Sequence, residues 1–315
     1  MTGQKLPMDA DWTEVSDPLV FSAKPVVSVV MITYNHERFL REAIDSVVAQ
    51  KTSFPFELVI SEDCSTDGTR RIAIEYQQEF PATIRLVYPS RNVGPNRNFA
   101  YALGAARGAF IAVCEGDDYW RDSGKLQKQA DFLNDNPDYV ACFHDRMQVN
   151  EGGEILAKGI SSESKRDLSR EELMLGYYIP TLTLCFRALR EELPDEFFKV
   201  VNADTFLISM LGRVGRAGFI ADISPAAYRF HEGGVWTAAG PAIRTIKSVE
   251  TFYWLSAFHK RKANIAVADK LIYAAMSLLH TSLVDRDRFP VRWIGATFFA
   301  GVYGWLRAIR SKVLM

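Results

Sequence analysis

Acidic side chains follow two apolar runs of this sequence at the point where each run ends. They are Glu62 and Asp63 after residues 56–60, and Glu115, Asp117 and Asp118 after residues 109–114. If both runs are buried strands, these carboxylates are partly desolvated, which is costly unless a cation or a hydrogen-bond donor compensates the charge. Mg²⁺ and Mn²⁺ prefer oxygen ligands and usually bind one or two carboxylates together with substrate phosphates. Asp117 and Asp118 are therefore candidate ligands of Mn²⁺ or Mg²⁺.

The same two aspartates have an interpretation that needs no metal. Aspartate is common in turns and at the start of helices, and an amphipathic segment begins at Lys125. Residues 117–118 would then form a turn and a cap before that helix. From spacing alone, both interpretations stay open.

The loop after the first apolar run contains no glycine. Residues 33–37 read Thr-Tyr-Asn-His-Glu, and no glycine occurs between Gly3 and Gly68. Phosphate-binding loops of the Rossmann and P-loop types need glycines so that backbone N–H groups can approach the phosphates. This disfavours dehydrogenases, P-loop enzymes and nucleotidyltransferases with a glycine-rich first loop.

Alternating strands and helices are expected to position these residues. The apolar, β-branched run 26–32 is typical of a strand buried on both faces of a parallel sheet. The pattern continues as a helix over 39–48, strand 56–60, helix 69–80, strand 84–88, a helix after the turn at 92–95, and strand 109–114. It predicts an α/β fold with a doubly wound, mostly parallel sheet, in which ligands bind beyond the carboxyl ends of the strands.

The composition is that of a globular protein with no overall attraction to nucleic acid. Of 315 residues 48% are hydrophobic, and 37 basic against 38 acidic residues give a net charge of -1. The four cysteines form no C-x-x-C pair and are expected to remain free thiols in a reducing compartment. Residues 1–17 are polar and acidic, unlike a secretory signal. We therefore expect a cytoplasmic protein.

One C-terminal segment has features of a membrane-contacting helix. Residues 293–306 carry no charge, but the run is shorter than the roughly 20 apolar residues of a spanning helix. Apolar positions recur there at helical spacing between basic flanks, as in helices that lie in a membrane interface. This interpretation predicts a peripheral protein on the inner face of the cell membrane. The alternative is a terminal helix packed on the domain or on a second copy.

Four motifs taken together resemble a known family. They are Val-Ser-Val-Val-Met-Ile-Thr-Tyr-Asn at 27–35, Glu-Asp-Cys-Ser-Thr-Asp-Gly-Thr at 62–69, Arg-Asn-Val-Gly at 91–94 and Glu-Gly-Asp-Asp at 115–118. In order and spacing they resemble the family 2 glycosyltransferases of the GT-A fold, most clearly from about Val26 to Asn150. The resemblance implies an N-terminal extension (1–24), a nucleotide-sugar-binding α/β domain (25–150), an acceptor-binding part of the same GT-A fold (151–240) and a C-terminal helical region (241–315).

The resemblance also implies which residues bind the donor nucleoside. Tyr34 would stack against the base, and Thr33, Asn35 and Glu37 of the same loop would contact the nucleoside. Asp63 would accept a hydrogen bond from the imide N–H of a uracil-like ring, which suits an acceptor-only carboxylate.

Two further donor-side positions are less clear. Where the family usually has paired aspartates this chain has Glu62 and Asp63, which leaves the base reader in place but puts the ribose contacts in doubt. Arg97 would approach the diphosphate, and the alternative is a solvated arginine on the surface of a helix.

The remaining implied roles concern the metal and the acceptor. Asp117 would meet the sugar or ribose and Asp118 the metal, which bridges the two phosphates. Asp204, just before an apolar helix, would be the base that takes the acceptor's proton, unless it is only the N-cap of that helix. His231, ahead of a Gly-Gly hinge, would donate to a phosphate or complete the metal shell, unless it is merely structural.

The function implied is that of an inverting glycosyltransferase. It would move a sugar from a nucleotide diphosphate sugar, most simply a UDP-sugar, to a hydroxyl of a saccharide or lipid-linked acceptor, in bacterial cell-surface polysaccharide or glycolipid assembly. The alternatives are a metal-dependent nucleotidyl- or phosphotransferase and a non-catalytic nucleotide-sugar binding protein.

Overall fold

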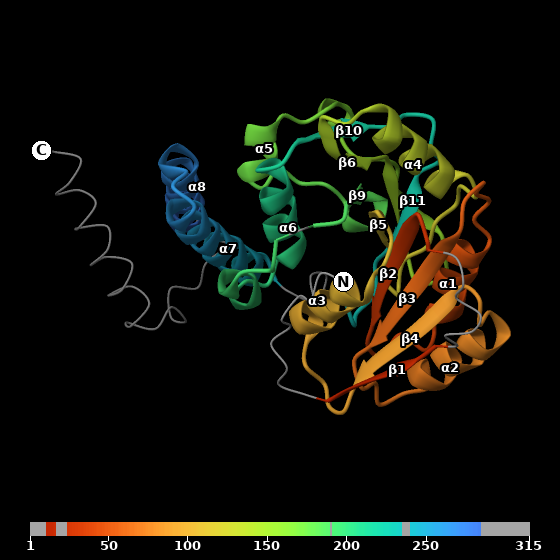
Figure 1. The fold of residues 1–315 in the computed structure, drawn as a ribbon. Helices are drawn as coiled ribbons and strands as arrows, with labels where there is room; N and C mark the ends of the chain where they lie inside the picture. The colour runs from red at the N-terminus through yellow and green to blue at the C-terminus, as the bar shows by residue number, and fades with distance from the viewer. Residues whose placement is uncertain (1–10, 17–23, 190, 235–239, 285–315) are drawn as a thin grey trace, which may run out of the picture.

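A computed structural model describes residues 11–16, 24–189, 191–234 and 240–284 of the chain. Within these residues an eight-stranded sheet is covered by helices on both faces, and a helical hairpin extends from one side (Figure 1). The predicted α/β class with a mostly parallel sheet is confirmed.

The large sheet has the strand order β1-β4-β3-β2-β5-β9-β6-β10. Its strands are β1 (Trp12–Val15), β2 (Val27–Thr33), β3 (Phe56–Glu62), β4 (Ile84–Pro89), β5 (Phe110–Val113), β6 (Tyr139–Phe143), β9 (Cys185–Arg187) and β10 (Arg216–Phe219). Strands β4, β3, β2 and β5 are mutually parallel, whereas β1 at the edge and β9 in the interior run antiparallel to their neighbours. A three-stranded sheet, in the order β11-β7-β8, comprises β7 (Arg146–Val149), β8 (Ile155–Ala157) and β11 (Ala226–Arg229).

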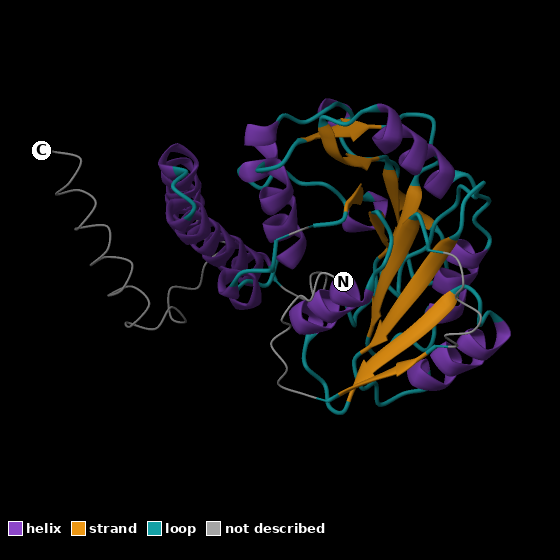
Figure 2. Ribbon diagram, viewed as in Figure 1, coloured by secondary structure: helices purple, strands orange, loops and turns teal. Residues whose placement is uncertain are grey.

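Helices lie on both faces of the large sheet, as Figure 2 shows. The helices are α1 (Leu40–Val48), α2 (Thr69–Glu79), α3 (Pro95–Ala105), α4 (Lys125–Asp135), α5 (Arg170–Met174), α6 (Ala203–Gly212), α7 (Pro241–Arg261) and α8 (Ile265–Val284). Successive residues of β2 point to opposite faces, so Val29 and Met31 pack in one core with α1, α2 and α4, while Val30 packs in the other with α3 and α6. Because both faces are buried, the central strands are mostly apolar, and their polar residues stand near the strand ends.

The strands and helices predicted in the first half occur within a few residues of their predicted limits. The run predicted as strand 26–32 is β2, Val27–Thr33, and the helix predicted over 69–80 is α2, Thr69–Glu79. The sequence did not indicate β1, which lies in the stretch expected only as an extension and pairs with β4. It also did not indicate that β9 and β10, from residues 151–240, would complete the same sheet.

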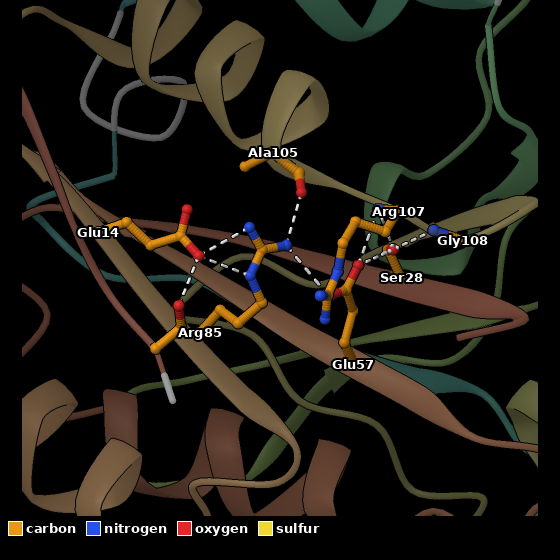
Figure 3. A network of polar contacts seen from close by, with 8 residues as sticks. Glu14, Ser28, Glu57, Arg85, Ala105, Arg107 and Gly108 are labelled. Atoms are coloured by element: carbon orange, nitrogen blue, oxygen red, sulfur yellow. Dashed lines mark hydrogen bonds and ion pairs between the residues drawn. The ribbon is translucent and has the colours of Figure 1, made fainter. Parts of the chain in front are cut away.

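A buried network of charges joins five segments near the amino-terminal ends of the strands (Figure 3). Glu57 of β3 is fully buried, and its carboxylate accepts hydrogen bonds from the Ser28 hydroxyl and from the backbone N–H of Arg107 at 2.5 and 2.8 Å. The guanidinium groups of Arg85 and Arg107 pair with the same carboxylate at 3.1 and 2.8 Å. Arg85 also pairs with Glu14 of β1 at 2.8 Å, which ties the edge strand to the core.

The C-terminal described residues form the hairpin of α7 and α8, which pack on each other. In the part of the chain that the structure describes, no helix is long and apolar enough to cross a membrane. The segment 293–306, predicted as an interfacial helix, lies outside the described residues.

Candidate functional site

The carboxyl ends of β2, β3 and β5 bring three of the sequence motifs together. Thr33 at the end of β2 is in register with Glu62 at the end of β3, and the Asp63 N–H donates to the Thr33 carbonyl at 3.0 Å. The Gly116 N–H, just after β5, donates to the Ile32 carbonyl at 3.0 Å. The loops 33–37, 62–69 and 115–118 therefore meet at one end of the sheet, where α/β proteins bind ligands.

In the loop after β2, Asn35 and Glu37 bind other parts of the protein. Asn35 has a positive φ of 55°, and its side-chain oxygen accepts from the Thr66 N–H at 2.8 Å. Glu37 accepts from the Gly68 N–H at 3.0 Å. These contacts fix the loop against the start of α2 and leave the ring of Tyr34 exposed, with 43% of its surface accessible.

Asp63, predicted to read the base, is buried and organises the loop after β4. Its two carboxylate oxygens accept from the N–H groups of Val93 and Gly94 at 2.8 and 2.9 Å. Gly94 has a φ of +84°, which favours glycine at this position. Burial raises the pKa of Asp63 and outweighs these two hydrogen bonds, which lower it. Each oxygen retains a second lone pair with which it could accept from a ligand.

Glu62 and Arg97 have different surroundings from each other. Glu62 accepts from the Ser65 N–H at 2.6 Å and pairs with Arg70 at 2.5 Å. The glutamate that stands where the family usually has an aspartate therefore binds other residues of the protein. Arg97 lies exposed on α3 near its N-terminus.

Two histidines and Asp117 form a group whose donor atoms could hold a metal ion. The Nε2 atoms of His231 and His36 lie 2.9 and 3.7 Å from the same oxygen, Oδ2 of Asp117. One ligand atom from each of the three residues lies within 4.8 Å of the others. Burial would raise the pKa of Asp117, but the charge of His36 and the hydrogen bond from His231 outweigh it and lower the pKa.

The surroundings of this group also suit a bound ligand. Thr33 Oγ1 and His36 Nδ1 are buried with no hydrogen-bond partner, and so is Glu115 Oε2. A Cβ atom on Gly116 would approach Thr33 Oγ1 to 2.7 Å and His36 Nδ1 to 3.0 Å, so the lack of a side chain there allows the loops to approach each other. Buried donors and acceptors without partners are rare in proteins, and here they gather at one place.

Asp118 lies beside this group and makes a different contact. It is buried, and its Oδ1 accepts from the backbone N–H of Arg229 in β11 at 2.8 Å. Burial, with the charges of Asp117 and Glu115, holds its pKa well above the usual range. Burial and the charges of Asp117 and Asp204 likewise raise the pKa of Glu115 to about 8. The four acids are therefore close enough to repel one another, and a cation among them would relieve that repulsion.

Asp204 lies in the first turn of α6, where Asn202 occupies the N-cap position, so the alternative of an N-cap does not apply. Its carboxylate accepts from the Thr205 N–H at 2.7 Å and from the Thr181 hydroxyl at 3.2 Å. Burial raises its pKa against these hydrogen bonds. Next to Thr181, the Leu182 carbonyl accepts from the indole N–H of Trp120 at 2.8 Å, so Asp204 lies close to the segment that follows β5.

The sequence motifs did not single out His36 or Glu115 as site residues. His36 and Glu115 stood inside motifs that were recognised, so their position beside predicted ligands was the available signal.

Comparison with known proteins identifies relatives of this chain. Residues 28–198 match the family model "Glycosyl transferase family 2". The uncharacterized protein Rv1520 of Mycobacterium tuberculosis is 36% identical over 213 residues, which cover 68% of this chain but only 61% of that protein. The poly(ribitol-phosphate) beta-N-acetylglucosaminyltransferase TarS of Staphylococcus aureus is 34% identical over 211 residues, covering 64% of this chain and 35% of TarS.

Solved structures show the same fold. A crystal structure of S. aureus TarS 1-349 in complex with UDP-GlcNAc has a TM-score of 0.61 at 19% identity and covers 80% of this chain and 72% of that one. The mannosyltransferase PcManGT from Pyrobaculum calidifontis, in complex with GDP-Man and Mn²⁺, has a TM-score of 0.53 at 17% identity. The match covers 96% of this chain and 84% of PcManGT.

Proposed function

We propose that this chain, which belongs to glycosyl transferase family 2, is an inverting glycosyltransferase that moves a sugar from a UDP-sugar to an acceptor hydroxyl. The observation that carries this proposal is the pairing of a candidate cation site, His36, Asp117 and His231, with a separate nearby carboxylate, Asp204. Inversion needs one displacement, with one group to stabilise the leaving diphosphate and one base for the acceptor.

The residues fit a divalent metal. His36, Asp117 and His231 would hold it, with Asp118 close by as the further ligand expected from the sequence. Two imidazoles and a carboxylate suit a first-row transition ion such as Mn²⁺ better than Mg²⁺, which prefers oxygen ligands. A metal bound there would act as a Lewis acid that neutralises charge on the nucleoside diphosphate.

The donor nucleoside is expected between the loops after β2, β3 and β4. The exposed ring of Tyr34 would stack on the base, while Asp63, already fixed by two backbone N–H groups, would accept from an imide. Thr33, with its unpartnered hydroxyl, would face the ligand, and Asn35 and Glu37 would shape the loop rather than reach the nucleoside. Arg97 on α3 would approach the diphosphate.

Asp204 would take the proton from the acceptor hydroxyl. Its raised pKa makes it a stronger base than an ordinary aspartate, and the Thr181 hydroxyl and Thr205 N–H would orient it.

The acceptor is proposed to be a saccharide or lipid-linked saccharide of a bacterial surface polymer. The support is the resemblance to TarS, which is named as a poly(ribitol-phosphate) glycosyltransferase. Contact of residues 288–315 with the inner membrane surface is part of the same proposal, and co-sedimentation of the intact and truncated chains with anionic vesicles would test it.

Thermal denaturation with nucleotides tests the main proposal. UDP with Mn²⁺ should raise the melting temperature more than UTP with Mg²⁺, and a chelator should remove the effect of UDP. Asp118→Asn should abolish the metal-dependent part of the rise in melting temperature with UDP. A larger shift with UTP would instead indicate a nucleotidyltransferase, and absence of sugar release from every nucleotide sugar tried would contradict transfer altogether.

A further inference from the structure

Arg146, the first residue of β7, carries a positive charge that no carboxylate of the described residues pairs with. Its Nε atom is buried and has no hydrogen-bond partner. With the Gln148 amide turned so that its oxygen faces the guanidinium, that oxygen accepts from the two Nη atoms at 2.8 and 3.1 Å. Arg146 is half-buried, and an arginine is charged at all ordinary pH values, so enclosing its Nε atom without a counter-ion is costly.

Another arginine of this chain, Arg166, shows the usual arrangement. The guanidinium carbons of Arg146 and Arg166 both lie 5.5 Å from the centre of a tyrosine ring, that of Tyr228 and that of Tyr177 respectively. Arg166 also pairs with Glu172 at 2.6 Å. Arg146 has the aromatic contact without the ion pair, although its donors are arranged to bind two oxygens of one anion.

Arg146 lies in the small sheet, paired with β11. Arg146, Gln148 and Tyr228 share one face of the small sheet, because Ala226 of β11 is in register with Arg146 of β7 and alternate residues point the same way. The charges of Asp118 and Asp117 act on the Tyr228 hydroxyl, after burial, to raise its pKa. Strand β11 lies beside these acids, because the Arg229 N–H donates to Asp118 and Tyr119 pairs with Ala227.

Tyr178 links Arg146 to the proposed base. Burial raises the pKa of its hydroxyl, the charge of Arg146 opposes that rise, and the charges of Asp204 and Asp118 add to it. Thr181, three residues further on, donates to Asp204 at 3.2 Å. Tyr178 is 54% exposed, so its ring could stack on a sugar.

We propose that Arg146 binds an anionic group, a phosphate or a carboxylate, of the acceptor saccharide next to Asp204. The proposal rests on the function proposed above. A bound anion would supply the missing counter-charge, and Tyr178 and Tyr228 would flank the sugar that carries it. Arg146 would thus select an acidic acceptor over a neutral one.

Calorimetry on the full chain loaded with UDP and Mn²⁺ tests this, with three probes. They are glucose 6-phosphate, methyl β-glucuronide and the neutral methyl β-glucoside. The wild type should bind at least one anionic probe more tightly than the glucoside, and the tighter of the two identifies phosphate or carboxylate as the group. Arg146→Gln should weaken that binding roughly 10-fold or more, as expected for the loss of a charged hydrogen bond. Arg146→Lys keeps the charge but not the paired donors, so its affinity for the anionic probe should lie between those of the wild type and Arg146→Gln.

Two controls separate the possible failures. Arg166→Gln should leave all three affinities unchanged, and Arg146→Gln should bind UDP with Mn²⁺ as the wild type does. Equal binding of charged and neutral probes, or binding of neither anionic probe, would overturn the role of Arg146 while leaving the proposed function intact. Loss of UDP affinity in Arg146→Gln would also overturn it, because the arginine would then serve the donor. Failure of the wild type to bind UDP would contradict the proposed function itself.

Discussion

The Nε2 atom of His231 lies 2.9 Å from Oδ2 of Asp117, although 114 residues separate the two in the chain. The contact exists because β11 ends beside the loop that follows β5, where the Tyr119 N–H donates to the Ala227 carbonyl at 3.2 Å. His36, from the loop after β2, reaches the same oxygen at 3.7 Å. Three distant segments thus contribute one donor each to a single small volume.

If these three residues hold the metal, removing either imidazole should weaken metal binding. We expect His231→Ala and His36→Ala each to reduce Mn²⁺ affinity in the presence of UDP by roughly 10-fold or more, because a ligand is lost. Calorimetric titration with Mn²⁺ measures this directly. His280→Ala, on the exposed surface of α8, is the control and should bind Mn²⁺ normally. Unchanged affinity in His231→Ala would mean that the histidine only orients Asp117.

The sequence predicted the parallel core well, because its strands are long, apolar runs bounded by turn residues. It did not indicate β1 or β9, which contain only four and three residues and are held by pairing to distant partners. Such short strands have no periodicity of their own to detect.

The same limit applied to the site. Asp63, Asp117 and Asp118 follow strands, so their common location could be inferred from strand order. The position of His231 beside Asp117 could not be inferred from strand order, because it depends on where β11 ends. The unpaired charge of Arg146 could not be inferred either, since a pattern of letters does not show that a counter-ion is missing.

Asp63→Ala should lower both UDP affinity and stability. The side chain accepts from the N–H groups of Val93 and Gly94, so its removal leaves two donors of the loop after β4 unsatisfied, at a cost of about 1–3 kcal/mol. Calorimetry with UDP and chemical denaturation measure the two effects. Asp131→Ala, on the exposed face of α4, should change neither. A loss of affinity at full stability would show that the loop does not depend on Asp63.

Glu57→Gln should destabilise the fold without affecting the site. The substitution leaves Arg85 and Arg107 facing a neutral group in a buried network, and breaking such a pair typically costs about 3–5 kcal/mol. Denaturant unfolding measures the loss. Glu75→Gln removes a carboxylate that pairs with Arg41 and Arg71 at the surface and should cost much less, because solvent screens exposed ion pairs. Equal effects of the two variants would contradict the structural importance of the buried network.

The free energy of unfolding should decrease as the pH is lowered, because His259 takes up a proton. This residue of α7 is buried, its Nε2 lies 2.8 Å from the Ser209 hydroxyl, and its Nδ1 has no partner for a proton. Burial and the charge of Arg213 lower its pKa from 6.5 to about 4. Between these values the unfolded chain binds more protons than the folded one, so stability decreases as the pH falls from about 6.5 to about 4.

Denaturant unfolding across this pH range, with His259→Gln for comparison, isolates the effect. The variant should be less stable than the wild type at neutral pH, but its stability should fall less on acidification. The slope of its unfolding free energy against pH should correspond to up to about one fewer proton taken up on unfolding. Parallel pH profiles for the two proteins would exclude His259 as the source.

Asp204→Asn should separate chemistry from donor binding. A metal site acts on the leaving group, whereas a base acts on the acceptor hydroxyl, so loss of the base should leave the affinity for UDP and Mn²⁺ unchanged. Asparagine has nearly the same shape, and its oxygen can still accept from Thr181 or from the Thr205 N–H. We expect the turnover number to fall by roughly 10² to 10⁴, the usual contribution of a general base. Steady-state kinetics with the acceptor, beside calorimetry with UDP, measure the two quantities.

Thr181→Val is the matched control, because it removes one hydrogen bond to Asp204 and keeps the carboxylate. That hydrogen bond lowers the pKa of Asp204 against the effect of burial, so its loss should raise the pKa further and move the acidic limb of the rate profile to higher pH. The turnover number at the optimum should change little. If Asp204→Asn keeps near-full turnover, the carboxylate is not the base. The next candidate is then Glu115, whose Oε2 is buried without a partner and whose pKa of about 8 leaves it able to exchange a proton near neutral pH.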